Sequence, residues 1–233
     1  MRFKSDVLPL TIAFWGEQCY NLRGARKGAF LAKYAFGSVD MSEREGFDGV
    51  ISEGDITFGY IMGSDTVLLI KTGQGGSISG YENKYINLAK AVSWRLGFSV
   101  VVSETICDKR ETYDREMNLI KGLFENKSCQ IYYFGVSKGG LIGCWYGADN
   151  PDIKRIMTVN MPLMVNFHNK TKPAIKALGR ERLTMVFGSR DPSYKYVPFV
   201  EKYGGVKILM GADHNLSGSP VNLWELVLLI VEK

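Results

Sequence analysis

A chain of 233 residues is long enough for one large domain or two small ones, and a domain of this size needs no disulfide or metal for its stability. With 45% hydrophobic and 23% charged residues, the composition excludes a disordered or collagen-like chain. The 29 basic and 24 acidic residues leave a net charge of only +5, and the basic residues are scattered rather than clustered. This distribution does not indicate a nucleic-acid-binding surface.

Cysteine spacing and hydropathy bear on where the protein works. The four cysteines lie far apart, at Cys19, Cys107, Cys129 and Cys144. They match neither a CxxC motif nor a Cys/His metal site, so we expect free thiols in a reducing compartment. The apolar residues 7–14 contain Pro9 and precede no small-residue cleavage site, which favours a strand over a signal peptide. The longest apolar run, Leu226–Val231, is too short to span a bilayer. We therefore expect a cytoplasmic protein.

Short apolar segments alternate with longer amphipathic ones along most of the chain. They predict, in chain order, strands at Leu10–Trp15, Ile56–Met62 and Thr66–Ile70, a helix at Tyr81–Leu96, a strand at Ser99–Ser103, a helix at Thr112–Glu125, a strand at Ile131–Phe134, a helix at Lys138–Tyr146, a strand at Arg155–Val159, a helix at Lys172–Leu178, a strand at Leu183–Phe187, a helix at Lys195–Tyr203, a strand at Val206–Met210 and a helix at Pro220–Val231. For the last helix, Ser219 is the candidate N-cap, with Pro220 in the first turn. Residues 16–53 have no clear period and form an irregular segment of uncertain role.

This alternation predicts βαβ units and a mostly parallel sheet with helices on both faces. The turn Gly63-Ser64-Asp65 predicts a hairpin between the strands on either side of it, so the sheet should begin with antiparallel pairing. No repeat or linker divides the sequence. We expect one domain over residues 1–233, an α/β/α sandwich of three layers.

The strongest chemical signal is Gly135-Val136-Ser137-Lys138-Gly139, between a predicted strand and a predicted helix. A serine on such a sharp turn has a strained backbone, and glycines on either side remove the side chains that would collide. The turn lifts the Ser137 hydroxyl above the C-terminal edge of the sheet. It also directs the backbone N–H of Lys138 at the same space. The alternative is a purely structural glycine-rich turn.

A serine hydroxyl needs a base to become a nucleophile, and the chain has two histidines. His214 follows a predicted strand, at the edge of the sheet where α/β active sites gather. His168 lies in an irregular stretch, which favours a surface or packing role. For the carboxylate that orients the imidazole, we favour Asp191, which follows another strand. Asp213 is less suitable because an immediate neighbour rarely points back at the ring, and Glu104 is a weaker candidate.

The glycine-rich stretch Lys71–Ser77 (KTGQGGS) follows the Thr66–Ile70 strand. It lacks the third glycine of a dinucleotide fingerprint and the Gly-Lys-Ser/Thr triplet of a P-loop. Its backbone N–H groups can instead face a developing oxyanion and complement the amide of Lys138.

Together these features resemble the α/β-hydrolase superfamily. The resemblance rests on the turn around Ser137, on the chain order Ser137, Asp191, His214, and on the glycine-rich loop. It covers roughly residues 55–233 and implies an eight-stranded sheet if Leu10–Trp15 is the first strand.

The family pattern also assigns two further features. By analogy, the amide of Gln74 joins that of Lys138 in an oxyanion hole. Many members carry a histidine where this chain has Thr72. The family's cap usually follows the sixth strand, and here only the short segment Leu163–Arg182 is available. The resemblance therefore implies a small or absent cap.

These observations predict a serine hydrolase that cleaves a carboxylic ester or thioester of a small molecule through an acyl-enzyme on Ser137, with no metal or organic cofactor. Candidate substrate-binding residues follow the sixth strand or adjoin the acid; they are Met161, Leu163, Met164, Phe167 and Tyr194, which could equally be core or surface residues. Lys138 could favour anionic acyl donors, or could be an ordinary exposed lysine. A catalytically silent binding protein that uses residues 16–53, or a peptidase, stays open as an alternative.

Overall fold

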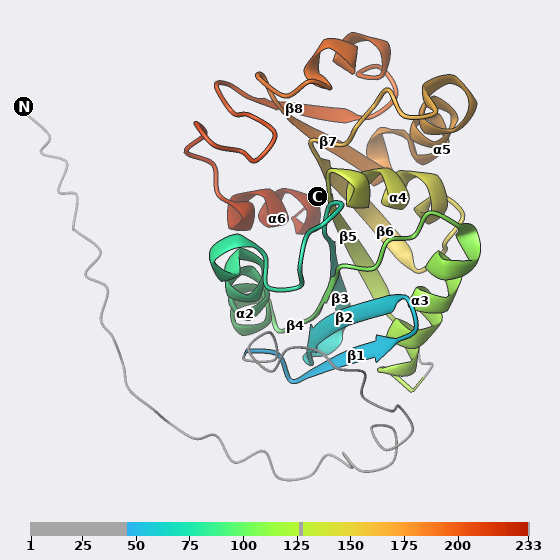
Figure 1. Cartoon of the computed structure of the whole chain (residues 1–233), viewed down its shortest axis with the longest axis vertical. Helices are drawn as coiled ribbons and strands as arrows, with labels where there is room; N and C mark the ends of the chain where they lie inside the picture. The colour runs from blue at the N-terminus through green and yellow to red at the C-terminus, as the bar shows by residue number, and fades with distance from the viewer. Residues whose placement is uncertain (1–45, 126–127, 233) are drawn as a thin grey trace, which may run out of the picture. The chain divides into compact units, whose positions relative to one another are not determined.

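A computed structural model of the chain describes residues 46–125 and 128–232 (Figure 1). These residues form an eight-stranded sheet in the order β1-β2-β4-β3-β5-β6-β7-β8. The strands are β1 (Gly49–Glu53), β2 (Ile56–Ile61), β3 (Ser64–Lys71), β4 (Phe98–Ser103), β5 (Gln130–Val136), β6 (Ile153–Val159), β7 (Leu183–Gly188) and β8 (Gly205–Leu209). The helices are α2 (Lys84–Leu96), α3 (Arg110–Gly122), α4 (Lys138–Gly147), α5 (Lys172–Arg182) and α6 (Leu223–Val231), with short helices η2 (Tyr81–Asn83), η3 (Phe167–Thr171) and η4 (Tyr194–Phe199).

Strand pairing confirms the prediction of a mostly parallel sheet with antiparallel strands at its start. β1 pairs antiparallel with β2, β2 pairs antiparallel with β4, and the remaining neighbours are parallel. The hairpin predicted at residues 63–65 is wrong, because β4 lies between β2 and β3. The hairpin is β1–β2, which turns at Gly54 and Asp55.

The first strand of the sheet was not predicted. β1 lies within residues 16–53, and its Val50 and Ile51 are buried in the cores on opposite faces of the sheet. Because both faces are covered, the strand shows no alternation of apolar and polar residues, and its pairing with β2 determines its conformation. The strand predicted at Leu10–Trp15 and the rest of the irregular segment, up to residue 45, lie outside the described residues.

Helices cover both faces of the sheet, which confirms the three-layer arrangement. α2 and α6 lie on one face, and α3, α4 and α5 lie on the other (Figure 1). Side chains along β3 alternate accordingly: Leu68 and Ile70 pack beneath α2 and α6, whereas Val67 and Leu69 face the other helices.

Two of the predicted helices differ from those in the structure, one in its first residue and one in its length and type. α6 begins at Leu223, because the Asn222 side chain accepts a hydrogen bond from the Glu225 backbone N–H at 2.9 Å and so takes the capping role expected of Ser219. The helix predicted at Lys195–Tyr203 is only the short 3₁₀ helix η4. It contains Pro198, which has no N–H to donate.

The fold brings one set of strand ends together. β3, β5, β6, β7 and β8 are mutually parallel neighbours, so their C-terminal ends lie at one edge of the sheet. In the described ranges no helix is both long and apolar enough to cross a membrane. Cys107, Cys129 and Cys144 are buried free thiols; Cys19 lies outside the described residues.

Candidate active site

Ser137 occupies a strained turn between β5 and α4, with φ 50° and ψ −120°. A Cβ atom at Gly139 would lie 2.3 Å from the carbonyl oxygen of Lys71, and one at Gly135 would lie 2.5 Å from the backbone nitrogen of Gly140. Both contacts are with backbone, which cannot move aside without shifting the end of β3 or the first turn of α4. Glycine at these two positions therefore permits the turn.

The three predicted side chains lie in contact. His214 Nε2 is 3.1 Å from Ser137 Oγ, and His214 Nδ1 is 2.5 Å from Asp191 Oδ2. The Asp191 side chain is fully buried, whereas the imidazole is 47% exposed. The other carboxylate oxygen of Asp191 accepts the Ser193 backbone N–H at 2.7 Å, which fixes the acid's orientation. The ring can thus take a proton from Ser137 while Asp191 faces its second nitrogen.

The rejected candidates have other partners. Asp213 Oδ1 accepts the backbone N–H groups of Asn215 and Ser217, so this carboxylate stabilises its own loop. Glu104 Oε2 accepts the backbone N–H of Ile78 at 2.9 Å. His168 is exposed in η3, where its ring packs edge-on against Phe167 with 5.1 Å between centroids.

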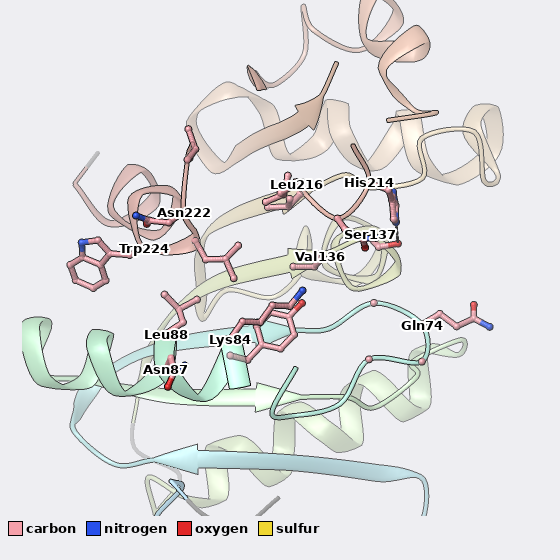
Figure 2. A pocket seen from close by; sticks show the side chains of 18 of the residues that line it. Gln74, Lys84, Asn87, Leu88, Val136, Ser137, His214, Leu216, Asn222 and Trp224 are labelled. Carbon is pink, nitrogen blue, oxygen red and sulfur yellow. Dashed lines mark hydrogen bonds between the residues drawn. The ribbon is translucent and has the colours of Figure 1, made fainter. Parts of the chain in front are cut away.

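The glycine-rich loop lies against this turn. A Cβ atom at Gly73 would be 3.1 Å from Ser137 Cβ, which places Gln74 one residue from that contact. Figure 2 shows the Gln74 side chain directed away from the space beside Ser137. Lys138 is the first residue of α4, and N–H groups of a first helical turn have no partner within the helix. The glycine-rich loop and the first turn of α4 therefore both adjoin Ser137.

No family model and no curated protein matches the sequence. Est1E from Butyrivibrio proteoclasticus superposes with a TM-score of 0.53 at 14% identity, over 77% of this chain and 93% of that one. XC6422 from Xanthomonas campestris, a serine hydrolase without a lid, gives 0.55 at 13% identity, over 76% and 88%. A serine hydrolase homologue from Coxiella burnetii gives 0.54 at 16% identity, over 79% and 95%.

The protein has the α/β-hydrolase fold. At these identities the likeness establishes the architecture, and the chemistry depends on the residues of this chain. In this α/β-hydrolase fold, β6 and β7 are joined by residues 160–182, which contain only η3 and α5. α5 packs on β6, β7 and α4, so it belongs to the sandwich and does not extend over the site.

The glycine-rich loop is held by local hydrogen bonds around Thr72. The Thr72 backbone N–H donates to the Ser103 carbonyl at 2.9 Å, and the Gly76 N–H donates to the Gly73 carbonyl at 3.0 Å. Thr72 Oγ1 lies 3.5 Å from the carbonyl oxygens of Gly73 and Gly76. Thr72 therefore interacts with the loop's own backbone.

The charge of Lys138 already has a partner. Its Nζ lies 2.6 Å from Asp108 Oδ1, and the lysine side chain is 24% exposed. The idea that Lys138 attracts anionic acyl donors thus loses its premise of a free cation beside Ser137.

A buried ion pair lies at the start of the glycine-rich loop, between the last residue of β3 and helix α3. It was not predicted from the sequence. Lys71 Nζ lies 2.5 Å from Glu116 Oε2, and both side chains are 1% exposed. The ammonium also donates to Ser103 Oγ at 3.0 Å. The Cys107 thiol lies 3.2 Å from Glu116, and burial raises its pKa to about 12, which keeps it a protonated donor. The available signal was Glu116 itself, a carboxylate on the apolar stripe of α3.

Asn160, at the end of β6, is a second residue that sequence reasoning missed. Its side chain is fully buried; Nδ2 donates to the carbonyls of Asp213 at 3.0 Å and His214 at 2.8 Å, and Oδ1 accepts the Gly188 N–H at 2.8 Å. The preceding Val159 carbonyl accepts the Ser137 N–H at 2.8 Å. This position therefore joins the loops that carry the serine, the acid and the histidine. A polar residue directly after a predicted buried strand was the signal for it.

We expect Asn160→Asp to lower kcat about 5- to 100-fold with little change in KM, because a carboxylate oxygen would face two carbonyl oxygens in place of the amide donor. The variant keeps the acceptor for Gly188 and nearly the same shape. Steady-state kinetics on a p-nitrophenyl ester would measure the effect. Asn166→Asp is the matched control, since Asn166 has a similar left-handed backbone (φ 47° against 50°) and is exposed. Equal kcat values for the two variants would contradict a positioning role for Asn160.

A cavity of about 670 Å³ opens beside Ser137 and His214, between α2 and α6. None of the five predicted substrate-binding residues lines it. Met161 and Leu163 are fully buried in the core beneath α3, α4 and α5, and Phe167 packs against that core. Met164 and Tyr194 are 59% and 39% exposed. The predicted residues do not line this cavity because the chain after β6 turns to the α5 face, whereas the cavity lies on the opposite face of the sheet.

A metal would need a cluster of ligands. Across residues 46–125 and 128–232, the structure contains no group of three or more His, Cys, Asp or Glu side chains arranged to hold one.

Proposed function

We propose that the protein is a serine hydrolase that cleaves a carboxylic ester or thioester. The observation that carries the proposal is the pair of contacts from Ser137 Oγ to His214 Nε2 and from His214 Nδ1 to the buried Asp191. The strained turn at Ser137 and the backbone donors beside it support the same chemistry. Esterases and serine hydrolases among the structural neighbours support it at the level of the fold.

In the proposed reaction, Ser137 Oγ attacks the carbonyl carbon as His214 Nε2 takes the hydroxyl proton. Asp191 stabilises the resulting imidazolium. The oxyanion of the tetrahedral intermediate accepts hydrogen bonds from the N–H groups of Gln74 and Lys138, and losing one such donor typically costs about 2.7–4 kcal/mol. Collapse of the intermediate breaks the bond to the alcohol or thiol, which takes the proton from His214.

The second half of the reaction repeats these roles with water as nucleophile. Water loses a proton to His214 and attacks the ester carbonyl of the acyl-enzyme, and the intermediate then releases the carboxylic acid and Ser137. The half-exposed imidazole allows water to reach the reacting carbon. This sequence of steps draws only on groups of the chain and on water.

A fluorophosphonate probe tests the proposal, because it forms a covalent bond with activated serines. We expect stoichiometric labelling of the wild type, at least about 100-fold slower labelling of Ser137→Ala, and wild-type labelling of Ser93→Ala, a serine on α2 far from the turn in sequence. Intact-protein mass spectrometry would report the adduct. A folded wild type that takes up no probe, or equal labelling of Ser137→Ala, would contradict the proposal and favour a binding protein.

A further inference from the structure

The cavity beside Ser137 is elongated and has distinct ends. Figure 2 shows Ser137 and His214 at one end and Trp224 at the other, with Leu88 of α2 on one side. Leu216 borders the opposite side, from the loop that follows His214. The cavity thus runs from the proposed nucleophile into the space between α2 and α6.

The lining is apolar inside and polar at the rim. Its buried or half-buried members are chiefly apolar, namely Tyr85, Leu88, Ala91, Val136, Val159, Leu216, Val221, Leu223 and Trp224. The side chains of Lys84, Asn87, Asn215 and Asn222 are exposed. No aspartate or glutamate is among the lining residues. Burial raises the pKa of the Tyr85 hydroxyl to about 12, so this group stays neutral. Such a lining suits an uncharged hydrocarbon better than a cationic or polyhydroxylated group.

The length of the cavity can be gauged along α2. Its α2 lining extends from Lys84 to Ala91, which is about 10 Å at a rise of 1.5 Å per residue. Bonds of about 1.5 Å in an extended zigzag chain advance about 1.25 Å each along its axis, so about nine carbons have that length. Trp224 borders the far end, and Arg95 of α2 lies 4.9 Å from the centroid of its ring. This cation–π contact holds the indole against α2.

The acyl side of the substrate fits this cavity better than the leaving group. The alcohol or thiol must depart past His214 before water can attack, and the imidazole is 47% exposed. A second hollow near Lys138 and the glycine-rich loop has a volume of only about 10 Å³, room for about one water molecule. This hollow is too small for a leaving group, which fits departure past the exposed His214 ring.

We propose that the substrate is a medium-chain acyl ester or thioester, with an unbranched acyl chain of about six to ten carbons lying between α2 and α6. The inference rests on the proposed function and specifies its substrate class. Val136 and Val159, at the ends of β5 and β6, contact the chain nearest the carbonyl. Ala91 and Trp224 contact its distal end.

The test is kcat/KM for p-nitrophenyl esters from acetate to palmitate. We expect a rise of about fourfold per methylene, the equivalent of burying each CH₂, up to about octanoate and a plateau or decline beyond it. Ala91→Trp should lower the ratio of kcat/KM for octanoate to kcat/KM for acetate at least about 10-fold. Lys90→Trp is the matched control, because this exposed neighbour on α2 does not line the cavity and should keep the wild-type profile.

A companion series of acetate esters with lengthening alcohols would follow the leaving-group side, where we expect no dependence on length. The inference is overturned if acetate is the best acyl group, if activity follows the alcohol, or if Ala91→Trp and Lys90→Trp behave alike. Fluorophosphonate labelling of the same samples separates the two proposals. A labelled Ser137 without acyl-chain preference contradicts only the medium-chain inference, whereas absent labelling with absent hydrolysis overturns both.

Discussion

Replacing His214 with alanine should lower kcat/KM for ester hydrolysis by about 10⁴- to 10⁶-fold while the protein remains folded. The imidazole is the group within 3.1 Å of Ser137 Oγ that can accept its proton, so without it the hydroxyl loses its base. The ring is 47% exposed, and its removal leaves no large void in the core. Continuous assay of p-nitrophenol release, with circular dichroism on the same sample, would measure both properties.

Asp191→Asn should reduce kcat by about 10⁴-fold, because an amide that donates to Nδ1 stabilises the wrong tautomer of the ring. His168→Ala is the control for both variants, since this other histidine is exposed in η3. It should retain full activity. The proposed roles would be untenable if His168→Ala were as inactive as His214→Ala, or if Asp191→Asn retained wild-type kcat.

Glu116→Leu alone should lower the free energy of unfolding by about 3–5 kcal/mol, because it leaves the buried ammonium of Lys71 without its counterion. The lysine and the glutamate are each 1% exposed and 2.5 Å apart, so water does not replace the lost partner. Urea denaturation followed by fluorescence would give the change. Asp114→Ala, which breaks an exposed ion pair with Arg110 on the same helix, should cost no more than about 1 kcal/mol.

The double variant Lys71→Met/Glu116→Leu should recover most of that loss, since two apolar side chains of similar size can be as stable as a buried ion pair. The double variant also separates the pair's effect on the stability of the protein from its effect on the geometry of the glycine-rich loop. Lys71 directly precedes Thr72 and the loop that carries Gln74, so a stable double variant should still show a lower kcat if the pair sets the geometry of that loop. A Glu116→Leu variant that costs less than about 1 kcal/mol would contradict the account of a buried, mutually dependent pair.

Much of the fold can be predicted from the sequence, because the residue patterns that indicate strands and helices are local. Apolar segments such as Ser99–Ser103 and Ile131–Phe134 lie in β4 and β5, and the periodic stripe of Tyr81–Leu96 becomes η2 and α2. The contacts of Ser137, Asp191 and His214 were also predictable, because each follows a recognisable strand and parallel strands end at one edge.

Other features depend on contacts between distant segments and leave little local trace. β1 is defined by its pairing with β2, and the start of α6 is defined by the side chain of Asn222. The ion pair between Lys71 and Glu116 joins β3 to α3, and the side-chain amide of Asn160 connects three loops. In the sequence, Lys71 and Asn160 are polar residues at the ends of apolar strands, and only the structure shows the partners that satisfy their hydrogen bonds.

From the sequence alone follow the mostly parallel sheet with helices on both faces and the side chains that meet at its edge, because local pattern and the position of each motif after a strand indicate them. The place of β4 between β2 and β3 does not follow from the sequence. The position of the cavity beside Ser137, in contrast, depends on tertiary packing. Val136 and Val159 border a cavity on the α2 and α6 face, whereas Met161 and Leu163 are buried on the other. The face to which each loop turns depends on the packing of whole helices against the sheet, and no single segment carries that information.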